Sequence, residues 1–145
     1  MNKIKEILSK NNTIAMIGVS KDLSKPSTIV MKYMQNYGYK VIPVNPRVKG
    51  EMILGEEVFG KLDEIKKKID IVDVFRPSKE AVEIAKDTVK IKAKALWLQL
   101  GISSEEAKEI VEANNIDYIE NRCTKMEYQK IFLKVTQAFP VLINR

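Results

Sequence analysis

Two short stretches near the start of the chain combine small side chains with the backbone freedom that phosphate binding requires. An apolar run at residues 13–17 is followed by Gly18-Val19-Ser20, and after a few residues by Lys25-Pro26-Ser27. A buried strand, a glycine turn and a helix N-terminus form the layout that binds phosphate through peptide N–H groups. Because Gly18 has no Cβ, it permits the tight turn and the close approach of a ligand to the backbone.

Reactive side chains are few. The chain has no histidine, and so it lacks the commonest general base, metal ligand and phosphoryl carrier. Cys123 is the one reactive candidate, between Arg122 and Lys125 and just before a predicted helix. Positive charge and the helix dipole both favour a thiolate, so we expect the pKa of Cys123 to be lowered. We expect neither a catalytic constellation nor a metal site.

Composition limits the class of protein. A length of 145 residues, with 45% apolar and 30% charged residues, predicts one globular domain. The formal net charge of +6 comes from 25 basic residues interleaved with 19 acidic ones, which is typical of solvated helix faces. No dense basic block alternates with aromatic residues, which argues against nucleic-acid binding.

Three features of the sequence bear on where the protein is located in the cell. No apolar stretch reaches the length of a membrane span, so we expect no membrane partner. The first ten residues mix lysines with isoleucine and leucine, which predicts a short amphipathic helix and not a signal peptide. The single cysteine excludes an internal disulfide framework, and we therefore expect a cytoplasmic protein.

Strand and helix patterns alternate along the chain. Strands are predicted at residues 13–17, 39–45, 70–75, 93–100 and 116–120. Helices are predicted at 26–37, briefly at 62–69, and after each later strand, with an irregular connection at 47–59. This alternation predicts an α/β fold with a mainly parallel five-stranded sheet and helices on both faces. We expect an N-terminal helix at 1–12, a domain at 13–136 and an apolar tail at 137–145.

Single residues add detail to the predicted strands and helices. Pro43 cannot donate to a strand ladder, so the second strand should pair imperfectly or lie near an edge of the sheet. We expect Ser78 to cap one helix, and two capping boxes to begin the later ones. These boxes pair Ser103 with Glu106 and Thr124 with Glu127.

Ligands of open parallel sheets bind beyond the carboxyl ends of the strands. There the sequence lacks the Gly-x-Gly-x-x-Gly pattern, and Asn45 stands where an NAD site usually has an acidic residue. Arg47 and Lys49 follow instead, and they suit a nucleotide with an extra phosphate, such as coenzyme A (CoA) or NADP. Exposed loop charges without a ligand are the plain alternative.

Six motifs occur in an order that resembles one protein family. They are Ile17-Gly18-Val19-Ser20, Lys25-Pro26-Ser27, residues 41–46 (Val-Ile-Pro-Val-Asn-Pro), Val72-Asp73-Val74-Phe75-Arg76, residues 96–101 (Leu-Trp-Leu-Gln-Leu-Gly) and Arg122-Cys123. Together they resemble the stand-alone CoA-binding proteins, which are similar to the nucleotide-binding domain of the succinyl-CoA synthetase α subunit. The resemblance covers residues 13–131 and implies a Rossmann-like single domain with CoA as its cofactor.

The resemblance also implies roles for particular residues. Phosphate would be met by Gly18, Val19, Ser20, Lys25 and Ser27. The nucleotide end would be surrounded by Val44, Asn45, Pro46 and Lys49, and the adenine or the phosphates flanked by Phe75, Arg76 and Pro77. The pantetheine path would be lined by Gly101, Ile102, Asn121, Arg122 and Cys123. The family usually has Cys-Pro where this chain has Cys123-Thr124, which shifts the expected place of the thiol.

Three functions stay open from the sequence. The first is a CoA or acyl-CoA binding module without turnover, in which Cys123 forms a mixed disulfide with the CoA thiol or stays an idle thiol. The second is an NADP-type oxidoreductase. The third is a regulatory subunit of an acyl-CoA enzyme. A homodimer or an acyl-CoA enzyme partner would use the apolar tail and the Met31 and Met34 side chains, which otherwise belong to the core. The synthetase's phosphoryl transfer is not expected, because this chain lacks its histidine.

Overall fold

The computed structural model describes residues 2–134, and its centre is a parallel sheet of five strands. The strands are β1 (Thr13–Ile17), β2 (Lys40–Val44), β5 (Ile71–Val74), β6 (Ala95–Leu98) and β7 (Asp117–Ile119). They lie in the order β2-β1-β5-β6-β7, and every neighbouring pair is parallel. The predicted Rossmann-like α/β fold is confirmed, with each strand at its predicted place and several strands shorter than predicted.

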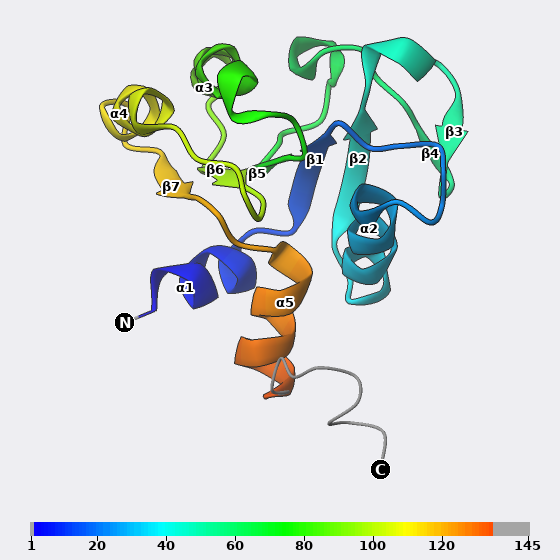
Figure 1. The fold of residues 1–145 in the computed structure, drawn as a ribbon, viewed down its shortest axis with the longest axis horizontal. Coiled ribbons are helices and arrows are strands. Elements are labelled where there is room, and N and C mark those ends of the chain that lie inside the picture. Colours follow the sequence, from blue (N-terminus) through cyan, green and yellow to red (C-terminus); the bar gives the residue numbers. More distant parts are fainter. Residues whose placement is uncertain (1, 135–145) are drawn as a thin grey trace.

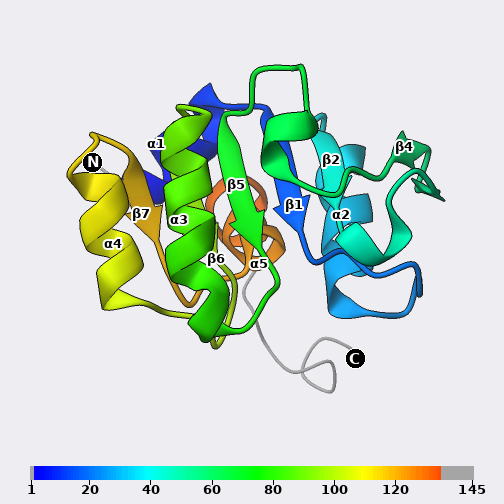
Figure 2. The ribbon, with the colours of Figure 1, turned by 90° about the horizontal axis from the view of Figure 1, so that it is seen from above.

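Helices cover both faces of this sheet (Figures 1 and 2). One face carries α3 (Ala81–Lys90) and α4 (Glu105–Glu112). The other face carries α1 (Lys3–Lys10), α2 (Pro26–Asn36) and α5 (Thr124–Tyr128), which continues as a π-helical turn at Gln129–Leu133. Within the described part of the chain, no helix is long and apolar enough to span a membrane.

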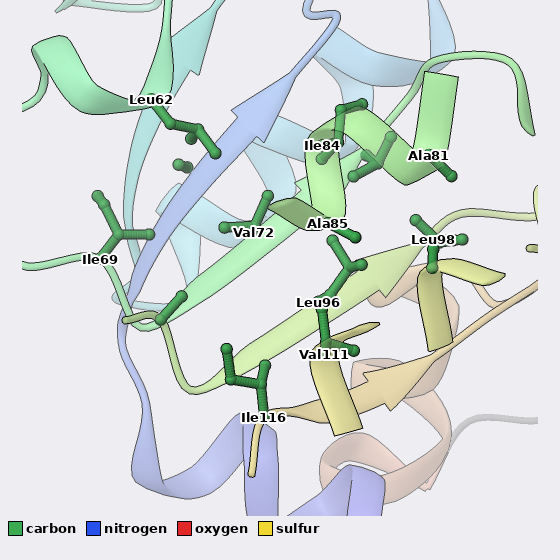
Figure 3. Packing of buried hydrophobic residues seen from close by; sticks show 14 of the residues in the cluster. Leu62, Ile69, Val72, Ala81, Ile84, Ala85, Leu96, Leu98, Val111 and Ile116 are labelled. Carbon is green, nitrogen blue, oxygen red and sulfur yellow. The ribbon is translucent and has the colours of Figure 1, made fainter. Parts of the chain in front are cut away.

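Two apolar layers hold the helices on the sheet. Figure 3 shows the first, in which Val72 and Leu96 of the strands meet Ile84, Ala85 and other side chains of α3 and α4. The second layer lies under α2 and contains Met31 and Met34, both fully buried against β1 and β2. These two methionines belong to the core of the domain, so they are not free to contact a partner.

The crossover from β2 to β5 is more ordered than the sequence predicts. Instead of an irregular stretch, it contains a 3-10 turn at Pro46–Val48, a hairpin of β3 (Met52–Ile53) and β4 (Glu56–Glu57), and a second 3-10 turn at Leu62–Glu64. The second turn replaces the short helix predicted near residues 62–69. Strands of two residues carry too little periodicity to be recognised in a sequence.

Strand β2 lies at the edge of the sheet, as Pro43 predicts. Its outer side is partly covered by the segment that follows the hairpin. The Phe59 N–H donates to the Pro43 carbonyl oxygen at 3.0 Å, and the Asn45 N–H donates to the Phe59 carbonyl oxygen at 2.8 Å. The nitrogen of Pro43 points to the same outer side as its carbonyl oxygen, so the missing N–H costs no hydrogen bond between β2 and β1.

Three predicted helix caps are wrong. The Ser78 side chain does not cap α3, and its hydroxyl instead accepts a hydrogen bond from the Ser103 N–H at 3.1 Å. Helix α4 is capped by Ser104, whose Oγ accepts from the Ala107 N–H, one residue beyond the predicted Ser103 box. Thr124 lies inside α5, with its hydroxyl turned into the core. The predicted apolar tail at 137–145 lies outside the described residues.

Candidate functional site

The strand order reverses between β1 and β5, and the backbone segments that follow these two strands lie close together there. Gly18 follows β1 with a φ of +90°, and its N–H donates to the Val44 carbonyl oxygen at 2.8 Å. A Cβ on Gly18 would lie 2.6 Å from the Phe75 carbonyl oxygen and 2.9 Å from Cδ of Arg76. Only glycine fits this position, and ligands of doubly wound sheets bind at such a switch point.

The turn after Gly18 is held by side chains from two other segments. The Ser20 N–H donates to Ser27 Oγ at 3.1 Å, and Thr28 Oγ1 donates to the Ser20 carbonyl oxygen at 2.7 Å. From β2, Asn45 Nδ2 donates to the Val19 carbonyl oxygen at 2.8 Å. Ser27 and Asn45 therefore fix the path of the turn relative to the start of α2 and the end of β2.

A cleft of about 670 Å³ opens beyond these strand ends. Its walls come from the turn after β1, the end of β2 with the 3-10 turn that follows, the segment at 60–62, the segment after β5 and one side of α3. It is lined by Ile17, Gly18, Ser20, Lys21, Val44, Asn45, Pro46, Arg47, Val48, Gly60, Lys61, Leu62, Arg76, Glu80, Ile84 and Asp87.

The cations of this cleft differ in how far they are neutralised. Arg76 forms a double hydrogen bond with Glu80, at 3.0 Å from Nε and 2.6 Å from Nη2, and this pairing raises the pKa of Arg76. Lys21 pairs with Glu51. Arg47 and Lys61 make no ion pair with any residue in the range 2–134. These two side chains are thus available to an anionic ligand.

A second cavity, of about 500 Å³, lies on the other side of Arg76. It is mainly apolar and is lined by Pro26, Val30, Phe75, Arg76, Pro77, Gln99, Leu100, Ile102 and Cys123. Arg76 lines both cavities, so the polar cleft and the apolar pocket meet at this residue. The site as a whole suits a ligand with a charged end and an extended apolar end.

The pKa of Cys123 is shifted in the direction opposite to the prediction. Burial raises the pKa of its thiol, and although the N–H groups of Met126 and Lys125 act in the opposite direction, burial is the larger influence. The nearby Asp73 also raises this pKa. The expected lowering of the Cys123 pKa is therefore wrong, because the sequence indicates the neighbouring charges but not the partial burial of the thiol.

Asp73 is a buried carboxyl group at the centre of the sheet, beneath the apolar pocket. Its side chain is 0% exposed, and burial raises its pKa to about 7 even though Gln99 and Thr124 form hydrogen bonds with it. Asp73 lies between Met16 of β1 and Trp97 of β6 in the strand register. No cation is among the groups that shift its pKa.

Ten of the predicted site residues line the two cavities. They are Gly18, Ser20, Val44, Asn45, Pro46, Phe75, Arg76, Pro77, Ile102 and Cys123. The others lie close by in different roles. Val19 is fully buried, Lys25 precedes α2 as an exposed residue, and Ser27 holds the turn.

The remaining predicted residues make bonds within the protein. Lys49 pairs with Glu64 at 3.0 Å, and the Gly101 N–H donates to Asn121 Oδ1 at 2.7 Å. Arg122 Nη1 lies 3.4 Å from Glu127 Oε2. The family resemblance implies a place for Lys49 at the nucleotide end, but in the structure the charge of Lys49 is paired with Glu64.

Sequence reasoning missed the wall formed by Gly60, Lys61 and Leu62. This segment reaches the cleft because Phe59 bridges to Val44 at the sheet edge, a contact between residues far apart in the sequence. It also missed Gln99, which lies within a strand-like apolar run and faces the second pocket. A polar side chain at the end of such a run is the one signal that could have drawn attention to it.

Comparisons with known proteins agree with this geometry. YneT of Bacillus subtilis strain 168 is 36% identical over 126 residues, which are 87% of this chain and 92% of that protein. A solved structure from Thermus thermophilus is 35% identical, with a TM-score of 0.87 over 91% of this chain and all of that one. The dinucleotide-forming acetyl-coenzyme A synthetase 1 of Ca. Korarchaeum cryptofilum is 25% identical, with a TM-score of 0.65 over 81% of this chain and 27% of its own.

The family comparison covers most of the chain. Residues 12–129 match the family described as the CoA binding domain. This range contains both cavities and all five strands of the sheet. The match agrees with the resemblance read from the motifs at the strand ends, and the chain belongs to the CoA-binding domain family.

Proposed function

We propose that this protein binds coenzyme A or an acyl-CoA across the carboxyl ends of β1, β2, β5 and β6, without turning it over. The observation that carries the proposal is the pair of cavities that meet at Arg76. CoA has a highly charged nucleotide joined through a pyrophosphate to a long, mostly apolar pantetheine arm. The polar cleft suits the nucleotide, and the apolar pocket suits the arm.

Within the cleft, the turn at Gly18 and Ser20 receives the pyrophosphate, whose oxygens can approach the backbone there. Arg47 and Lys61, which have no acidic partner among residues 2–134, face the remaining phosphate charge. A Cβ on Gly18 would lie 2.9 Å from Cδ of Arg76, and this closeness supports a role for Arg76 beside the proposed phosphate site. The arm then passes Arg76 into the pocket that contains Cys123.

Isothermal titration calorimetry with CoA tests this function. We expect the Arg47→Gln and Lys61→Gln variants to bind CoA about 3- to 10-fold more weakly, with a smaller dependence of affinity on salt concentration. Lys10→Gln removes the same charge from α1, away from the cleft, and should bind CoA as the wild type does. The absence of heat with both CoA and acetyl-CoA would refute the proposal.

We further propose that Cys123 exchanges with CoA disulfide to form a mixed disulfide. The Cys123 sulfur attacks one sulfur of CoA disulfide, a new S–S bond forms, and the other CoA leaves as its thiolate. The raised pKa of Cys123 makes this exchange slow at neutral pH and faster in alkali. Intact mass under non-reducing conditions should gain one CoA, and Cys123→Ser should gain none. A wild-type protein that stays unmodified at pH 9 would contradict this step.

A further inference from the structure

The apolar pocket contains one uncharged amide side chain, that of Gln99. Gln99 follows β6, is only 3% exposed, and still lines the pocket beside Leu100 and Cys123. A buried amide among apolar walls needs partners for its donor and acceptor atoms. The partners of Gln99 are therefore informative about what the pocket accepts.

The side-chain nitrogen of Gln99 is held by hydrogen bonds to two buried residues, Asp73 and Thr124. Gln99 Nε2 donates to Asp73 Oδ1 at 2.6 Å and to Thr124 Oγ1 at 3.1 Å. Thr124 Oγ1 in turn donates to Asp73 Oδ2 at 3.1 Å. Above its pKa of about 7, Asp73 is an ionised carboxylate that can only accept, and the single hydroxyl proton of Thr124 is already used on Asp73. Both partners thus require a donor from Gln99, which fixes the amide with its nitrogen inward.

The carbonyl oxygen of Gln99 is left over. Oε1 accepts no hydrogen bond from residues 2–134. It is also not sealed inside the protein, because it is not among the fully buried side-chain nitrogen and oxygen atoms that lack a partner in residues 2–134. Since Gln99 lines the pocket, this unpartnered acceptor is reached from the pocket.

We propose that Gln99 Oε1 accepts a hydrogen bond from an amide N–H of the pantetheine arm, in an orientation imposed by Asp73 and Thr124. The proposal rests on the CoA binding proposed above. The arm carries one hydroxyl near the pyrophosphate and, farther along, two amides. The amide N–H groups are therefore the donors that lie nearest its thiol end, on the side of the pocket that contains Cys123. Phe75, Leu100 and Ile102 provide the apolar walls for its methylene groups. Asp73 and Thr124 are positioning residues that act through Gln99.

Calorimetry with two ligands tests this assignment at pH 8, above the Asp73 pKa of about 7. The ligands are CoA and 3′-phosphoadenosine 5′-diphosphate, which lacks the arm. Gln99→Met keeps the length of the side chain but removes the acceptor. We expect this variant to bind CoA about 5- to 10-fold more weakly, the equivalent of one hydrogen bond, and to bind the nucleotide half as the wild type does.

The outcomes separate the two proposals. Unchanged CoA affinity in Gln99→Met, or equal weakening of both ligands, overturns the role of Gln99 while leaving CoA binding intact. No binding of either ligand by the wild type overturns CoA binding itself.

A second measurement uses only the wild-type protein, so it tests the assignment even if the Gln99→Met variant fails to fold. Analogues of CoA in which an ester oxygen replaces one amide N–H are titrated into the wild type. One of the two analogues should bind about 5- to 10-fold more weakly than CoA. If both analogues bind as tightly as CoA, the assignment is overturned.

Discussion

At the scale of single residues, two glycines with nearly the same backbone conformation have different surroundings. Gly18 has φ +90° and Gly38 has φ +95°. A Cβ at Gly18 would collide with the Phe75 carbonyl oxygen, whereas a Cβ at Gly38 would meet nothing within 4 Å. The pair therefore separates the cost of a left-handed backbone from the cost of a close approach.

We predict that Gly38→Ala lowers the free energy of unfolding by about 1 kcal/mol, which is the backbone cost alone. Gly18→Ala should lower it by about 2–4 kcal/mol, because the strand ends must also move apart. Chemical denaturation measures both. Gly18→Ala should in addition weaken CoA binding, while Gly38→Ala should not. Equal destabilisation by the two changes would contradict the close approach at Gly18.

At the scale of elements, Asp73 joins β5 to β6 and α5 through Gln99 and Thr124. Burial raises the Asp73 pKa to about 7, above the ordinary value of 3.8 that we expect in the unfolded chain. Between pH 3.8 and about pH 7, Asp73 is therefore protonated in the folded protein and ionised in the unfolded chain. The resulting stability is fully present below pH 4 and is lost as pH rises through 7.

We predict that Asp73→Asn removes this pH dependence, since an asparagine stays neutral. The difference in unfolding free energy between the variant and the wild type should change by a few kcal/mol between pH 4 and pH 8, in favour of the variant at the higher pH. Urea denaturation at several pH values measures it. Parallel pH profiles for the two proteins would show that Asp73 keeps an ordinary pKa in the fold.

The elements also show how far sequence reasoning extends. The strands could be predicted because each is a short apolar run followed closely by Gly, Pro or Asn, and so could the tight turn at Gly18. The order of the strands in the sheet could not, because it depends on pairing between distant segments. The caps could not, because Ser78 and Thr124 hydroxyls bind partners that are distant in sequence. The charge of Lys49 was visible, but its pairing with Glu64 depends on how the crossover folds.

At the scale of the whole molecule, binding at the switch point should stabilise the entire domain. A ligand at about 100 times its Kd adds about 2.7 kcal/mol to the unfolding free energy. For a chain of this size, that corresponds to a rise in Tm of about 5–10 °C. CoA should produce this rise in a thermal-shift experiment.

NADP provides the comparison ligand in the same experiment. It carries the additional ribose phosphate but has a nicotinamide riboside where CoA has its flexible arm, so it leaves the apolar pocket unfilled. We predict a smaller rise in Tm with NADP than with CoA at equal concentration. A larger rise with NADP would favour an oxidoreductase over the proposed binding function.

The segment at 46–61 contributes both to the ligand cleft and to the protection of the sheet edge. It supplies Arg47 and Lys61 to the cleft, and through Phe59 it shields the outer edge of β2 from pairing with another chain. Shortening this segment would therefore cost solubility as well as affinity. We therefore expect a deletion within this segment to impair CoA binding and the protection of the sheet edge together.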